Sequence, residues 1–135
     1  MSKTIVIDEK SSGIVKNGGY WFYHEGDLIT ADSNLIIKVP LAVGGKVKVN
    51  GNVEARDSLD VVMGLSVSGS LSIEGTLEVG CMAEVRGSLS ISGESNFYNS
   101  LTVGGKITTE DALTVQGKLR SGVKMRRVKK DQGNE

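Results

Sequence analysis

Apolar residues recur along most of this chain at positions one and three of a six-residue unit. The unit is clearest in LSVSGSLSIEGTLEVG, residues 65–80. Steps of six from Leu65 in both directions give 18 first positions between Tyr23 and Met125, of which 15 are Val, Ile, Leu or Met. Position three is Val or Ile at 11 of the 14 places from 37 to 115. The count runs without insertion or deletion, so Ile29, a first position, is expected in the core.

This unit predicts a short strand followed by a corner. Positions one and three have the period of two that buries one face of a strand. Position five is usually glycine, which supplies the backbone freedom that a sharp corner needs. A strand and a corner of constant length, repeated many times, are typical of a β-solenoid and not of a series of hairpins.

The number of units in one coil follows from the exceptions at position five. Met63, Cys81 and Asn99 are 18 residues apart, and so are the glycines at 51, 69, 87 and 105. The sequence therefore predicts an all-β, single-stranded triangular β-helix with three hexads, or 18 residues, per coil. Residues 35–125 would make about five regular coils, roughly 24 Å long at about 4.8 Å per layer. We expect a right-handed coil, because the order of apolar and small residues differs from that of left-handed hexapeptide helices.

The chain divides into three parts on this pattern. Residues 1–28 are predicted to form an N-terminal strand and an aromatic capping segment, residues 29–122 the solenoid, and residues 123–135 a basic, disordered tail. Four of the six aromatic residues are consecutive in the first part, and they would cover the exposed strand edge of the first coil, with Trp21 substantially buried. The candidate cap is Tyr20, Trp21, Phe22 and Tyr23.

The net charge is zero but unevenly distributed. Residues 1–117 contain 14 acids and nine bases, whereas residues 118–130 contain seven bases and no acid. Such a run suits an anionic membrane surface, while the lack of aromatic residues within it makes nucleic acid an unlikely ligand. One cysteine and no apolar leader predict a cytoplasmic protein, with peripheral membrane contact through the tail. The candidate contacts are Lys124, Arg126, Arg127, Lys129 and Lys130.

One corner of the predicted prism departs from the polar pattern. The 18-residue period brings five apolar residues to it, where the other corners carry glycine and polar residues. Outward side chains would form a contact patch, while inward side chains would belong to the core, and the sequence leaves both open. The candidate interface is Val62, Met63, Cys81, Met82 and Tyr98.

No motif predicts catalysis, a cofactor or a metal. The one histidine, His24, has no marked ionisable partner, and Cys81 has no nearby base that would activate it as a nucleophile. GGKVKVNG, at residues 44–51, lacks the lysine and hydroxyl that open a helix in a phosphate-binding loop. We expect a protein that is not an enzyme.

The hexads LAVGGKVKVNGNVEA, LSVSGSLSIEG and LTVGGKITTEDALTVQGKL, together with the short polar tail, resemble the bactofilins, bacterial cytoskeletal proteins that form polymers. The resemblance covers about 80–90 residues. It implies a structural protein that self-assembles end to end without a nucleotide, often at the membrane. An alternative is a small binding module, such as a phage-encoded inhibitor or tail-fibre-type segment, that engages a protein partner through its acidic face or its apolar corner.

Overall fold

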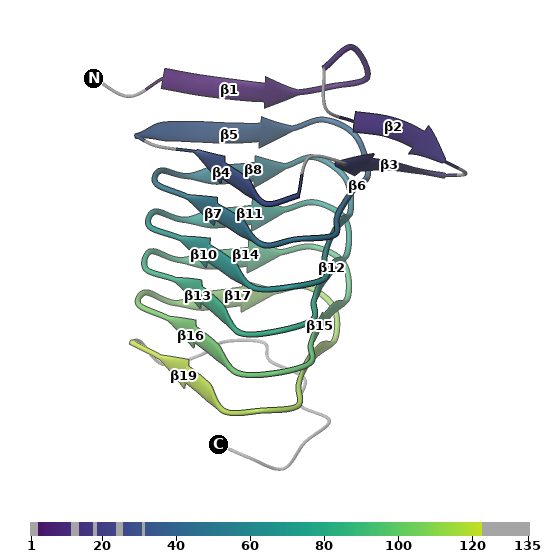
Figure 1. Cartoon of the computed structure of the whole chain (residues 1–135). Coiled ribbons are helices and arrows are strands. Elements are labelled where there is room, and N and C mark those ends of the chain that lie inside the picture. The colour runs from purple at the N-terminus through teal and green to yellow at the C-terminus, as the bar shows by residue number, and fades with distance from the viewer. Residues whose placement is uncertain (1–2, 12–13, 18, 24–25, 31, 123–135) are drawn as a thin grey trace.

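The chain folds as a β-solenoid with three faces, each of which is a sheet of mainly parallel strands (Figure 1). The computed structural model describes residues 3–11, 14–17, 19–23, 26–30 and 32–122. These residues contain nineteen strands and no helix. The predicted fold class is therefore confirmed: an all-β solenoid with about 18 residues per coil.

The strands form three sheets, which we name A, B and C. Sheet A contains β1 (Lys3–Ile7), β5 (Ser33–Ile37), β8 (Val53–Ala55), β11 (Leu71–Ile73), β14 (Leu89–Ile91) and β17 (Ile107–Thr109). Sheet B contains β2 (Ile14–Asn17), β3 (Tyr20–Tyr23), β6 (Leu41–Val43), β9 (Leu59–Val61), β12 (Leu77–Val79), β15 (Ser95–Phe97) and β18 (Leu113–Val115). Sheet C contains β4 (Leu28–Thr30), β7 (Val47–Val49), β10 (Leu65–Val67), β13 (Ala83–Val85), β16 (Leu101–Val103) and β19 (Leu119–Ser121).

From β5 onward the chain visits the three sheets in the fixed order A, B, C, and five regular coils follow one another. Each strand pairs in parallel with the strand one coil later, as Leu71 of β11 does with Leu89 of β14. Positions one and three point inward throughout: Leu71 and Ile73 are each 1% exposed, whereas Ser72 and Glu74 between and after them are exposed. The predicted register is confirmed over these coils.

The corners are also held together from coil to coil. At the corner between sheets C and A, the N–H of Gly69 donates to the carbonyl oxygen of Gly51, and the N–H of Gly87 donates to that of Gly69, each at 2.9 Å. A Cβ at Gly87 would lie 2.6 Å from the Ser70 hydroxyl oxygen and 2.9 Å from the Gly69 carbonyl oxygen. This close approach of successive coils explains the glycine column that the sequence shows.

Before β5 the constant spacing breaks, and one prediction is wrong. In β4 it is Leu28 and Thr30 that are buried, while Ile29 is 57% exposed. Leu28 pairs with Val47, 19 residues away in place of 18. The additional residue lies between β4 and β5, where Asp32 has the left-handed φ of 57° that asparagine and aspartate tolerate better than most residues. Counting without insertion therefore places Ile29 on the wrong face.

The first coil is longer than the others because it contains a hairpin. β1, β3 and β4 pair in parallel with the strands of the next coil, and β2 pairs with β3 in antiparallel. The aromatic segment adds a strand to the edge of sheet B, with Trp21 in register with Leu41. Trp21 and Tyr23 are partly buried against the core, whereas Phe22 faces outward. Sheet B consequently has seven strands and the other sheets have six.

The core contains one local exchange of volume. Ser95 and Phe97 are the inward residues of β15, and both are 1% exposed. Ser95 stacks between Leu77 and Leu113, where the repeat normally has an aliphatic residue. Within the described ranges its hydroxyl oxygen is buried without a hydrogen-bond partner. The space that the small serine leaves is compensated by the large phenylalanine two residues away.

We predict that Leu71→Asp abolishes folding. An unpaired carboxylate in this dry core costs several kcal/mol, against a total stability of about 5–15 kcal/mol for a domain. Circular dichroism and thermal melting measure the effect. Ser72→Asp, one residue away on the outer face, is the matched control and should melt close to the parent protein. A folded Leu71→Asp protein with a normal melting temperature would contradict the register.

Ser95→Ala should stabilise the protein by about 1 kcal/mol, because it removes a buried hydroxyl that has no hydrogen-bond partner. Chemical denaturation measures the change in the free energy of unfolding. Ser90→Ala, at an exposed position of β14, is the control and should change that energy little. A loss of stability on Ser95→Ala would mean that the hydroxyl is satisfied in the native protein.

Candidate interaction surface

The apolar residues singled out in the sequence lie at one corner, where the chain passes from sheet B to sheet C. We name this the B–C corner. It is built from five stacked three-residue turns, and the N–H of Cys81 donates to the carbonyl oxygen of Met63 in the turn before (3.0 Å). The turns are residues 44–46, 62–64, 80–82, 98–100 and 116–118.

Four of the five candidate interface residues project into solvent. Val62 is 54% exposed, Met63 and Tyr98 are 48% exposed and Met82 is 64% exposed, whereas Cys81 is half-buried. Inward tucking, one of the two possibilities that the sequence left open, does not occur at these four positions. The corner therefore presents methionine, valine and tyrosine side chains on consecutive coils of a rigid scaffold.

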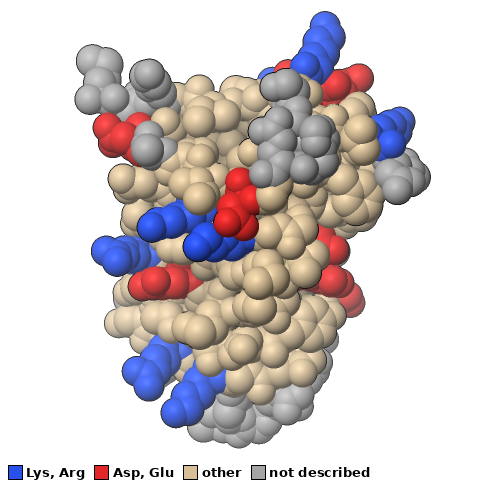
Figure 2. Space-filling model, in the orientation of Figure 1, with Lys and Arg blue, Asp and Glu red and all other residues tan. Residues whose placement is uncertain are grey.

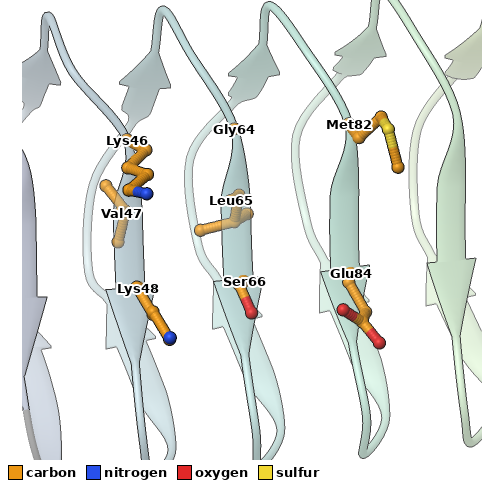
Figure 3. A pocket seen from close by; sticks show the side chains of 8 residues that line it. All are labelled: Lys46, Val47, Lys48, Gly64, Leu65, Ser66, Met82 and Glu84. Carbon is orange, nitrogen blue, oxygen red and sulfur yellow. The ribbon is translucent and has the colours of Figure 1, made fainter.

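A shallow groove of about 280 Å³ runs from this corner onto the outer face of sheet C. Figure 3 shows Lys46 and Lys48 at the start of β7, Met82 and Glu84 at the start of β13, and Gly64 and Ser66 at the start of β10 between them. Small outward residues on β10, between longer ones on β7 and β13, thus create the groove.

The two faces that meet at this corner differ in charge. The outward residues of β6, β9, β12, β15 and β18 on sheet B include Asp60 and Glu78 and no base. Partial burial raises the pKa of the Asp60 carboxyl. On the side of the molecule in Figure 2, acidic and basic side chains lie among uncharged surface, and some of them adjoin.

Sheet C and the corner residues that lead into it are richer in bases. Lys46, Lys48, Lys118 and Arg120 are all exposed there. Glu84 on the same sheet lies 3.9 Å from Arg86. In the part of the chain that the structure describes, neither Lys46 nor Lys48 is in an ion pair. The regular strands of sheet B therefore carry acids and no base, whereas sheet C carries Lys48, Arg120 and one acid, Glu84.

The N-terminal end exposes apolar side chains as well as strand edges. Ile5 and Val6 of β1 are each 40% exposed, and Val15 of β2 lies opposite Phe22 of β3 on the outer face of sheet B. Lys16 lies 5.9 Å from the centre of the Trp21 ring, within the range of a cation–π contact. The aromatic segment of the candidate cap thus lies at this end, with Tyr20 partly buried.

Several candidates from the sequence lie outside the described residues. They are His24 and the tail bases Lys124, Arg126, Arg127, Lys129 and Lys130. Within the described ranges, no group of three His, Cys, Asp or Glu side chains could hold a metal ion. No helix among these residues is long and apolar enough to cross a membrane.

Sequence reasoning found the apolar residues of the corner but missed the groove and the difference in charge beside it. The signal was present, because Lys46, Gly64 and Met82 are 18 residues apart in the same column. In this column a small residue lies between two long ones, and this difference in size creates the groove. A search for apolar residues alone does not detect it.

These features define a β-solenoid with an exposed apolar corner between an acidic and a more basic face. Comparisons of the chain with protein-family models, with curated proteins and with solved structures find no match. The fold class is thus established by the structure alone.

Proposed function

We propose that this chain is a non-catalytic structural protein that assembles with copies of itself through its solenoid, as the bactofilin-type polymers that its repeats resemble do. The single observation that carries the proposal is the B–C corner, where four exposed apolar residues lie together. Val62, Met63, Met82 and Tyr98 occupy the outside of a regular scaffold whose other corners are mainly polar. Methionine and tyrosine are enriched at protein–protein contacts.

The scaffold favours this use because its surface is rigid and repetitive. Consecutive coils hold their outward side chains in columns, so a contact made at one coil can be repeated at the next. A strand at the edge of a sheet can template pairing with another chain, and β1 is the first strand of sheet A. Contact of the basic tail with an anionic membrane remains a prediction.

A second candidate function is a small binding module that engages a different protein through the same corner or through the acidic face of sheet B. One observation favours it over an end-to-end polymer. Because β2 adds a seventh, antiparallel strand to sheet B, the N-terminal end is one strand higher on that sheet than on the others. The additional strand therefore prevents a second solenoid from stacking evenly on all three sheets at this end. This favours a discrete complex over an end-to-end polymer.

The double change Met63→Ser plus Met82→Ser tests the proposal. Both side chains are exposed, so we expect the melting temperature of the protomer to change little. The assembled fraction should fall, because apolar contact area worth about 25 cal/mol per Å² is lost from the interface. Sedimentation velocity over a range of concentrations measures the species present.

Glu74→Ser plus Ser92→Thr, at an exposed corner between sheets A and B, is the control and should assemble like the parent protein. A parent protein that sediments as a monomer at every concentration would exclude self-assembly and leave the binding module. A large fall in melting temperature on the methionine changes would instead assign these side chains to protomer stability.

A further inference from the structure

The two sides of the B–C corner alternate in size, and they do so out of step with each other. The side next to sheet B is formed by the first residue of each turn, and the side next to sheet C by the third. Along the first side, small and large residues follow one another from coil to coil, and along the second side the order is reversed. The first side is Gly44, Val62, Gly80, Tyr98 and Gln116, and the second is Lys46, Gly64, Met82, Ser100 and Lys118.

In four of the five turns, therefore, a large residue on one side is matched by a small residue on the other. Val62 is followed by Gly64 in one turn, and Tyr98 is followed by Ser100 two turns later. The turn between them has Gly80 and then Met82. The groove of Figure 3 is one of the resulting hollows, with Gly64 in its floor and Met82 at its rim.

Packing within one chain explains only part of this alternation. A Cβ at Gly80 would collide with the Val62 carbonyl oxygen, so glycine is required there. Gly44 has no atom within 4 Å of an added Cβ, and the nearest atom to one at Gly64 is the Met82 carbonyl oxygen at 3.2 Å. Neither of these two glycines has a positive φ. A Cβ at Gly64 would therefore press on the Met82 backbone, whereas at Gly44 neither backbone conformation nor a close contact among the described residues requires glycine, which there costs stability through chain entropy.

We propose that the B–C corner is the contact between two copies of this chain, which lie side by side and parallel about a two-fold axis that runs along the corner. This inference rests on the proposed self-assembly and specifies its geometry. A two-fold axis parallel to the solenoid brings the sheet B side of each copy against the sheet C side of the other at the same height. In the first four turns each large residue then meets a small one of the second copy, and in the fifth turn Gln116 meets Lys118.

In the proposed contact, large and small residues of the two copies pair turn by turn. Val62 of the second copy faces the hollow at Gly64, and Met82 faces Gly80 of the second copy. Tyr98 of the second copy faces Ser100 in the same way. The middle residues of the turns, such as Met63, lie near the axis and meet their own equivalents. The contact is self-complementary, as an isologous interface requires.

Charge favours the same arrangement. The parallel axis places Asp60 of sheet B one coil from Lys48 on sheet C of the second copy. Glu78 lies level with Glu84 of the second copy, whose carboxylate is 3.9 Å from the Arg86 guanidinium. Asp60 is partly desolvated in the single chain and lacks an ion pair among the described residues. Opposite charges across an interface steer association and fix its register.

The antiparallel alternative has neither advantage. An axis perpendicular to the solenoid through the turn at Cys81 brings sheet B against sheet B and sheet C against sheet C. Val62 would then meet Tyr98 of the second copy, and Gly64 would meet Ser100. Large residues would oppose large ones and small ones would leave gaps, while acids would face acids and bases would face bases.

Disulfide trapping distinguishes the two axes. We replace Cys81 by Ser and introduce Met63→Cys, at a position that is exposed and lies near the parallel axis. In the parallel contact the two introduced thiols meet at the same height, within the Cα separation of about 7 Å that a disulfide tolerates. Mild oxidation of the full chain, followed by non-reducing electrophoresis, should convert most of the assembled protein into covalent dimer. Ser72→Cys in the same background, exposed on sheet A, should give only monomer.

The antiparallel contact gives a different result. Two cysteines introduced at position 63 would be about 10 Å apart along the solenoid, two layers of about 4.8 Å, and could not bridge. A mixture of the Met63→Cys and Asn99→Cys chains would cross-link instead. Cross-linking in that mixture alone would overturn the parallel geometry, and absence of cross-linking in a protein that still assembles would exclude the corner as the contact. A parent protein that remains monomeric would show that the proposed function itself has failed.

A hole-filling variant supplies a second readout. Gly64→Gln occupies the groove that receives Val62 of the second copy, and we expect the dissociation constant of the dimer to rise at least about tenfold, equivalent to about 1.4 kcal/mol. Ser72→Gln is the matched control and should leave it unchanged. An unaltered dissociation constant for Gly64→Gln, in a chain with a normal melting temperature, would contradict the fit of large against small residues.

Discussion

The hydrogen bonds between each coil and the next are the interaction on which the rest of the structure depends. Every regular strand pairs in parallel with the strand 18 residues later, so the strands keep one register from coil to coil, and additional residues fit only between strands, as they do between β4 and β5. The constraint reaches the corners, where backbone groups of Gly51, Gly69 and Gly87 bond in sequence. Side chains extend it, since the Asn34 side-chain oxygen accepts from the N–H of Asn52.

This constraint separates the roles of the residues in a simple way. Inward positions must fill a narrow triangular core, so they are aliphatic, with local exchanges of volume such as Ser95 and Phe97. Outward positions are free of that requirement and stack in columns. A column of outward residues can therefore vary for the sake of a contact while the fold remains unchanged. The B–C corner shows such variation, with Val62, Met82 and Tyr98 exposed in place of glycine and polar residues.

Most of the fold could be predicted from the sequence because period and register are properties of neighbouring residues in the chain. Leu71 and Ile73 are buried as their positions require, and the 18-residue coil follows from glycines that lie above one another. The irregular first coil could not be predicted in the same way. Its register depends on a hairpin between β2 and β3 and on one additional residue near Asp32. Neither can be detected by counting residues in steps of six.

Only part of the candidate site could be predicted from the sequence. The apolar corner follows from the column positions of Met63 and Cys81, but whether its side chains point outward depends on the course of the backbone at each turn. The size match between Val62 and Gly64 across the corner acquires meaning only when two faces are known to meet there. The proposed pairing of sheet B with sheet C of a second copy thus depends on how the folded solenoid places the two sheets at one corner, and no local sequence motif predicts it.

Native mass spectrometry of two charge-reversed chains tests this central claim most directly. One chain carries Asp60→Lys on the face of sheet B, and the other carries Lys46→Glu and Lys48→Glu on the face of sheet C. In the parallel contact each variant alone brings like charges together, whereas a mixture pairs opposite charges on both sides of the axis. The account predicts monomers of each variant and heterodimers in an equimolar mixture. Homodimers of either variant at the parent protein's level, or a mixture that stays monomeric, would contradict it.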